Sequence, residues 1–93
     1  MTQMTEIKNI LAQRGAVYGD FESGAQIMQA LKSIIHSRSA GYKPYQKEAL
    51  EMICHKIGRI LNGNPDYVDS WADIAGYAQL VVDALNNRNS TNA

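Results

Sequence analysis

Apolar residues recur every three or four positions along most of the chain, a spacing typical of amphipathic helices. No segment shows the sustained alternation of apolar and polar residues that marks a half-buried strand. The pattern predicts four helices, which cover Thr5 to Arg14, the stretch after Asp20 as far as His36 to Arg38, Pro44 to Asn62, and Asp66 to Asn87. The predicted fold class is therefore all-α, a small four-helix bundle with short connections that assembles as an oligomer.

Residues that favour helix ends mark several of these boundaries. Gly15 is expected to end the first helix and Gly63 the third, because glycine commonly follows the last helical residue. Asp20 is predicted to cap the second helix, and Pro44 suits the first position of the third. Asn64 is expected to cap the fourth helix.

The chain has 93 residues, which is the size of one small domain. Residues 1–87 are predicted to form a single domain, and residues 88–93 a polar, disordered tail. A domain of this size hides only roughly 60–65% of its unfolded surface, so the core is expected to be thin.

Charge and composition narrow the choice of partners. Nine basic and nine acidic residues cancel, which argues against a general electrostatic affinity for nucleic acid or for an anionic membrane. The single cysteine cannot form an internal disulfide. The polar start, MTQMTEIKNI, is unlike a signal peptide, and no apolar run approaches the roughly 20 residues of a membrane helix. We therefore expect a cytoplasmic protein with no membrane partner.

The third predicted helix has two distinct faces when its residues are projected at about 100° per position. Its apolar side carries Leu50, Ile53, Ile57, Ile60 and Leu61, with Cys54 at the margin. The opposite side carries Glu48, Glu51, His55 and Arg59. The apolar side is expected to face the core.

The fourth predicted helix is apolar around most of its circumference beyond Ile74. Its apolar stripe is expected to comprise Val68, Trp71, Ala72, Ala75, Ala78 and Val82, opposite a row formed by Asp66, Asp69, Asp73 and Tyr77. A helix of this kind is enclosed by its own bundle or by a second subunit, which predicts a homo-oligomer formed through it. Gly76, inside this helix, implies either tight packing or access for a ligand.

The acidic residues of the two long helices allow two interpretations. The short link between the helices predicts antiparallel packing, which places Asp73 towards the depth of Glu51 and His55. The carboxylates could then form an ion site, or Arg59 could simply pair with Asp69. A row of charges opposite an apolar stripe is most often a solvated face.

The residues Glu48-x-x-Glu51 and Asp73-Ile74-Ala75-Gly76-Tyr77-Ala78 also bear a resemblance to a known family. The likeness extends over Arg14, Tyr18-Gly19-Asp20-Phe21, Glu51-Met52-Ile53, Lys56, Arg59-Ile60, and Asp69 to Tyr77. With these residues the sequence resembles the MazG-like phage and prophage proteins of the all-α nucleoside triphosphate pyrophosphatase superfamily. The resemblance implies an oligomeric helical bundle that binds a nucleotide through Mg²⁺ and, in active members, releases pyrophosphate.

The resemblance also suggests roles for individual residues. Glu48, Glu51 and Asp73 match family carboxylates and Asp69 is adjacent, so these four are the candidate Mg²⁺ ligands, with Glu51 and Asp73 as candidate catalytic residues. The candidate nucleotide and phosphate contacts are Lys56, Arg59, Arg14, Tyr18 and Tyr77. Arg59 suits a bidentate phosphate contact.

Two positions depart from the family pattern. Lys47 and Ser70 stand where the family has glutamates. The alternative to an enzyme is therefore a non-enzymatic phage accessory protein, located in the host cytoplasm, that binds a nucleotide or a host protein. Direct binding to nucleic acid is not expected, because the helices carry no basic stripe.

Several of the same residues also have a plainly structural interpretation. Tyr18 and Phe21 are expected to anchor the connector between the first two helices in the core. Trp71 is expected in the core, and Cys54 is expected to behave as a buried hydrophobic residue. His55 needs no function.

Overall fold

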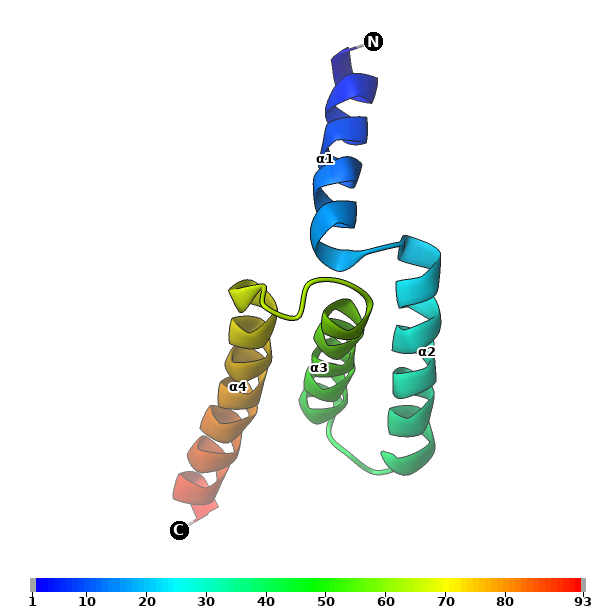
Figure 1. Cartoon of the computed structure of the whole chain (residues 1–93). Coiled ribbons are helices and arrows are strands. Elements are labelled where there is room, and N and C mark those ends of the chain that lie inside the picture. Colours follow the sequence, from blue (N-terminus) through cyan, green and yellow to red (C-terminus); the bar gives the residue numbers. More distant parts are fainter. Residues whose placement is uncertain (1, 93) are drawn as a thin grey trace.

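The chain folds into four helices joined by short connections (Figure 1). The computed structural model describes the backbone of residues 2–92 and the side chains of residues 3–88. The helices are α1 (Thr2–Tyr18), α2 (Phe21–Arg38), α3 (Pro44–Asn62) and α4 (Val68–Asn92). Residues 2–92 contain no strand, so the all-α fold class with four helices is confirmed.

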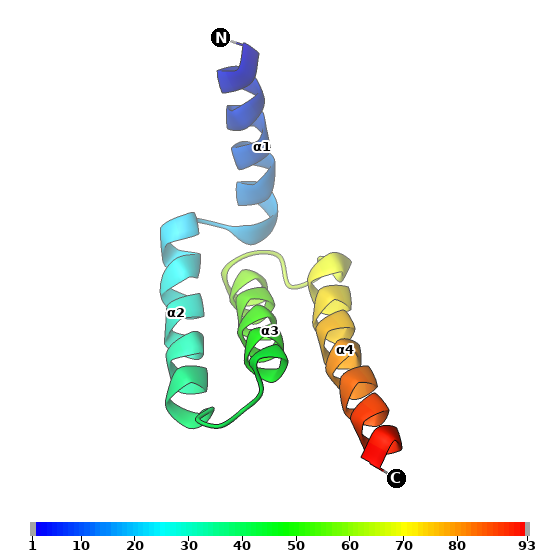
Figure 2. The ribbon, with the colours of Figure 1, turned by 180° about the vertical axis from the view of Figure 1, so that it is seen from behind.

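Three of the helices form a single layer, with α3 between α2 and α4 in both views (Figures 1 and 2). Consecutive helices in the layer run antiparallel, as predicted for α3 and α4. Helix α1 extends away from one end of the layer. The molecule measures 58 × 28 × 26 Å, and its radius of gyration of 16.5 Å exceeds the roughly 12 Å typical of a compact domain of this length.

Local sequence accounts for the bounds of α2 and α3. The Asp20 carboxylate accepts a 3.0 Å hydrogen bond from the backbone N–H of Ser23, which confirms Asp20 as the N-cap of α2. Helix α3 begins at Pro44 and ends before Gly63, as predicted. Proline lacks the N–H that the first helical turn leaves unpaired, so it suits that position.

The prediction that Gly15 ends the first helix is wrong, because α1 continues to Tyr18. The helix ends instead at Gly19, whose φ of +80° is a conformation that L side chains rarely adopt. A Cβ atom at Gly19 would also collide with the backbone oxygen of Asn62. The connector between α1 and α2 is therefore only Gly19 and Asp20.

Helix α4 begins two residues later than predicted and extends further. The Asn64 side chain accepts a 2.9 Å hydrogen bond from the backbone N–H of Asp66, which organises a turn ahead of α4 at Val68. The helix continues to Asn92, so the backbone of the segment predicted as a disordered tail is helical as far as residue 92. Residue 93 lies outside the described residues.

The end of α3 holds the base of α1 against the layer. Asn62 Nδ2 donates hydrogen bonds to the backbone oxygens of Tyr18 (3.0 Å) and Asp20 (2.7 Å). The Asn64 N–H donates to the backbone oxygen of Val17 at 2.7 Å. One side chain and one backbone amide thus fix where α1 leaves the layer.

The core is thin, as predicted. Its buried apolar residues are Ala49, Cys54 and Ile60, which confirms that Cys54 is buried. Among the described residues no large side chain is less than 2% exposed. Two expected core residues are not in the core, because Phe21 is 83% exposed and Leu61 is 65% exposed.

The face of α4 predicted to be buried is largely exposed. Trp71 is 55% exposed, and its indole N–H donates to the Pro65 carbonyl oxygen at 2.7 Å rather than entering the core. All six residues of the expected stripe, Val68, Trp71, Ala72, Ala75, Ala78 and Val82, are exposed. The partly or fully buried positions are Ser70, Ile74, Tyr77, Val81, Ala84 and Leu85. The packed face of α4 is therefore rotated from the predicted one.

Candidate functional site

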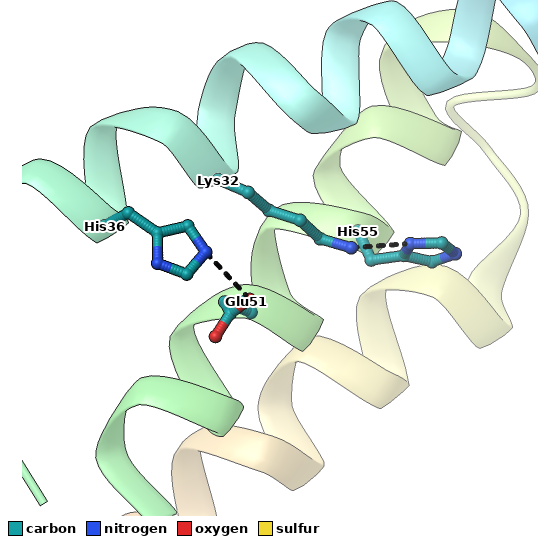
Figure 3. Close-up of polar contacts among 4 residues, drawn as sticks. All are labelled: Lys32, His36, Glu51 and His55. Atoms are coloured by element: carbon teal, nitrogen blue, oxygen red, sulfur yellow. Dashed lines mark hydrogen bonds and ion pairs between the residues drawn. The ribbon is translucent and has the colours of Figure 1, made fainter. Parts of the chain in front are cut away.

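Positive charge gathers around His55, at the middle of the layer. His55 lies on the polar side of α3, and its Nδ1 is 3.4 Å from Nζ of Lys32 on α2 (Figure 3). A lysine ammonium only donates hydrogen bonds, so Nδ1 accepts and the ring is neutral with its proton on Nε2. Burial lowers the pKa of His55, and the charges of Lys32, Arg59 and Lys56 lower it further.

Arg59 lies one helical turn beyond His55 and packs on an aromatic ring. Its guanidinium carbon is 4.1 Å from the centre of the Tyr18 ring, a cation–π contact. Tyr18 packs edge-on against Tyr67, with the ring centres 5.9 Å apart. The Tyr67 hydroxyl donates to the Asp69 carboxylate at 3.1 Å, and this hydrogen bond is the main reason that the pKa of Tyr67 is raised.

Lys56 connects the cluster to α4. Its Nζ lies 2.9 Å from the Asp73 carboxylate, and its side chain is largely buried whereas that of Asp73 is half-exposed. One turn before His55, on the side of α3 that faces α2, Glu51 lies 3.5 Å from Nε2 of His36 (Figure 3). The ion pairs within residues 3–88 therefore leave Lys32 and Arg59 without a carboxylate partner.

The predicted metal ligands do not converge within one chain. Glu51 contacts α2 through His36, whereas Asp73 contacts Lys56 between α3 and α4. Asp69 accepts a hydrogen bond from Tyr67, and Glu48 is exposed. In the part of the chain that the structure describes, no three His, Cys, Asp or Glu side chains are grouped so that they could hold a metal ion.

Among the candidate nucleotide contacts, the structure brings three together. Lys56, Arg59 and Tyr18 all lie at the cluster around His55. Arg14 is exposed on α1, and because α1 runs to Tyr18 it does not lie in the last turn as expected. Tyr77 is half-buried on α4.

Sequence reasoning missed Lys32, which belongs to the cluster, and Tyr67, which packs against Tyr18 beside it. Lys32 is partly buried on α2, and no spacing within that helix indicates that it faces His55. Tyr67 lies in the turn before α4, where periodicity gives no signal. His55, interpreted as needing no function, is the centre of the cluster.

The opposite side of α3 is apolar. A hollow of about 310 Å³ opens there between α3 and α4, lined by Tyr42, Gln46, Ala49, Leu50, Ile53, Ala78 and Val81. Leu50 and Ile53 are three residues apart on α3, and so are Ala78 and Val81 on α4. Residues at this spacing share one side of a helix, so these two sides of α3 and α4 border the hollow. The polar and apolar surfaces of the molecule are thus separated by α3.

Comparison with known proteins places the chain in a family. Residues 3–84 match the family described as a domain of unknown function (DUF6378), and the chain belongs to that family. No curated protein and no solved structure matches it. The family description names no activity, so the resemblance to MazG-like proteins stays a prediction. No helix within the described residues is long and apolar enough to span a membrane.

Proposed function

We propose that this protein binds a nucleotide through its phosphate groups, at the cluster formed by Lys32, His55, Lys56 and Arg59. One observation supports the proposal above all. Three cations act on one partly buried, neutral histidine, and two of them, Lys32 and Arg59, form no ion pair within the described residues. Such a cluster has a positive potential that an anion would neutralise.

In this proposal each residue has a part in binding. Arg59 presents a planar fork of donors suited to two phosphate oxygens, and the Tyr18 ring holds its guanidinium in place. Lys32 supplies a second positive charge from α2. Neutral His55 offers its Nε2–H as a further donor to a phosphate oxygen. Lys56 can turn from Asp73 towards the bound anion.

We also propose that Mg²⁺ binds together with the nucleotide, as a complex with its phosphate groups. This ion is commonly held by one or two carboxylates together with substrate phosphates and water. Asp73 is the best placed carboxylate, because it already lies against Lys56, and Glu51 is the next. Mg²⁺ bound there would neutralise part of the negative charge of the phosphate groups. Because residues 3–88 offer no three-ligand group, we expect weak Mg²⁺ binding when no nucleotide is present.

Hydrolysis to a monophosphate and pyrophosphate is the further step that the MazG resemblance suggests. The competing proposal is a non-enzymatic phage accessory protein, in the host cytoplasm, that binds a nucleotide or a host protein. The dispersal of Glu51, Asp69 and Asp73 over separate contacts, with Glu48 exposed, favours this alternative.

A panel of nucleoside and deoxynucleoside triphosphates with Mg²⁺ tests these proposals. At least one of them should raise the melting temperature of the wild type. Arg59→Ala should weaken its binding by roughly 10- to 100-fold, the value of a charge-assisted hydrogen bond. Arg38, which is exposed at the end of α2, provides the matched control, because Arg38→Ala should leave binding unchanged. Equal losses in both variants would refute the assigned site.

Pyrophosphate release in the same samples separates the enzyme from the accessory protein. Release that is lost in Glu51→Ala and Asp73→Ala, with both variants folded, would establish an enzyme. Nucleotide binding without release would establish a binding protein. A response to no nucleotide would refute the proposal and favour a protein partner.

Assembly is part of the proposal too. We infer that the protein forms a homo-oligomer in which α4 takes part, because this helix exposes Val68, Trp71 and Val82.

A further inference from the structure

The chain exposes far more surface than a monomer of its mass normally does. Its accessible surface is 6870 Å². A folded monomer of 10.3 kDa is expected to expose about 5,400 Å². The excess of roughly 1,500 Å² per chain falls in the range that each partner of an obligate homodimer buries.

The apolar side of the layer contributes exposed large residues, among them Leu61, Trp71 and Val82. The hollow between α3 and α4 shows that Leu50 and Ala78 lie on this side. Helical spacing continues the stripe of Leu50 to Ile57 and Leu61 on α3. It continues the stripe of Ala78 to Trp71, Ala75 and Val82 on α4. We call this surface, formed by Leu50, Ile57, Leu61, Trp71, Ala75, Ala78 and Val82, the apolar face.

Helix α1 carries a second unpartnered apolar surface. Met4, Ile7, Ile10 and Leu11 lie within one side of the helix, and all four are exposed. Helices of this length draw most of their stability from packing an apolar side, whereas the apolar side of α1 stays exposed among the described residues. Its base is nevertheless fixed by hydrogen bonds from Asn62 and Asn64, so α1 projects as a positioned arm.

The dimensions of the two surfaces match, and the net charge of the chain does not oppose their contact. The 17 residues of α1 extend about 25 Å, and the 19 residues of α3 extend about 28 Å, so the arm can cover the length of the apolar face. The formal net charge of zero sets up no long-range repulsion between two copies.

We propose that two copies of this chain form a dimer in which α1 of each copy packs on the apolar face of the other. A reciprocal exchange of this kind has twofold symmetry, so both copies use the same two surfaces. The dimer is therefore closed, and neither surface remains free to bind a third copy. The exchange also accounts for the small core of one chain, whose buried apolar residues are only Ala49, Cys54 and Ile60 among those described. In the dimer, α1 of the second copy adds apolar side chains to this core. The site around His55 stays open, because it lies on the other side of α3.

Glutamate substitutions on the two surfaces test the proposal by analytical ultracentrifugation. Leu11→Glu on α1 and Leu61→Glu on the apolar face each place a charge in the contact, and each should weaken dimerisation by roughly tenfold or more. Leu80→Glu is the matched control. Leu80 is 63% exposed, close to the 65% of Leu61, but its position on α4 lies away from the apolar face, so this variant should dimerise as the wild type does.

Each possible result either supports or overturns the proposed dimer. A dimeric wild type and control, with both other variants shifted to monomers of unchanged helix content, would support the exchange. A monomeric wild type would overturn it, and the apolar face would then await a different protein. Loss of the dimer in Leu61→Glu but not in Leu11→Glu would also overturn it, because α1 would not be the occupant.

Discussion

At the scale of single residues, the side chain of Asn62 connects two separate segments of the chain. Its amide nitrogen donates to the carbonyl oxygens of both Tyr18 and Asp20, and so joins the end of α3 to the connector between α1 and α2. Asn62→Ala removes both hydrogen bonds. We expect a loss of about 2 kcal/mol in unfolding free energy, which corresponds to a fall in melting temperature on the order of 10 °C. Thermal unfolding followed by circular dichroism measures it, and an unchanged melting temperature would contradict this account.

His55 makes stability depend on pH in a defined direction. Burial and three nearby cations hold its pKa in the folded chain below the ordinary value of 6.5. As the pH falls through 6.5, the unfolded chain binds a proton before the folded chain does, so the free energy of unfolding decreases. Above that pH the ring is neutral in both states, and this contribution is fully present.

The variant His55→Gln isolates this effect, because the glutamine amide oxygen can still accept a hydrogen bond from Lys32. Between pH 7.5 and pH 5.5, we expect the melting temperature of the wild type to fall further than that of His55→Gln. Melting curves of both proteins at the two pH values provide the comparison. An equal fall would show that His55 is not protonated preferentially on unfolding.

At the scale of the helices, we expect alanine substitutions at two glycines to change the free energy of unfolding in opposite directions. A Cβ atom at Gly58 would lie 2.5 Å from Cγ of Met28, so α2 and α3 pack closely there. We expect Gly58→Ala to lower the free energy of unfolding by about 1–3 kcal/mol. Gly76, on α4, has no such neighbour within 4 Å, so of the two alternatives, tight packing and ligand access, the single chain does not provide the first. Gly76→Ala should raise the free energy of unfolding by about 0.5–1 kcal/mol, because glycine is unfavourable inside a helix.

Urea denaturation of the two glycine variants checks both signs in one experiment. The midpoint should move down for Gly58→Ala and up for Gly76→Ala. If Gly76→Ala is instead destabilising, this face of α4 is covered by something that the single chain does not contain.

The helices also show how far sequence reasoning reaches. Helix α3 was predicted at both ends, because Pro44 and Gly63 are local signals whose meaning needs no partner. The packed face of α4 was predicted wrongly, since apolar residues surround that helix and periodicity cannot choose between its sides. The choice is made by contact with α3, which buries Ser70 and leaves Trp71 exposed.

The candidate site was only partly predictable for the same reason. Lys56, Arg59 and Tyr18 were identified from the resemblance and lie together. Lys32 joins them from another helix, and no spacing within α2 specifies that it faces His55. Glu51 contacts His36 on α2 and Asp73 contacts Lys56 beside α4, so an ion site that joins the two carboxylates stays a prediction.

At the scale of the whole molecule, α3 divides the layer into two working surfaces. One side carries the charged cluster and the other carries the apolar face. The division predicts that ligand binding and assembly are separable. Leu61→Glu should dissociate the dimer and retain nucleotide affinity, whereas Arg59→Ala should do the reverse.

The most direct test of the phosphate site is an NMR titration of the ¹⁵N-labelled protein with a magnesium nucleoside triphosphate. The largest shifts should fall on the backbone amides of residues 55–59 and of Tyr18. The indole N–H of Trp71, which donates to Pro65 on the apolar side, should not move. Shifts confined to the hollow around Leu50 and Ala78, or no shifts with any nucleotide, would contradict the phosphate site.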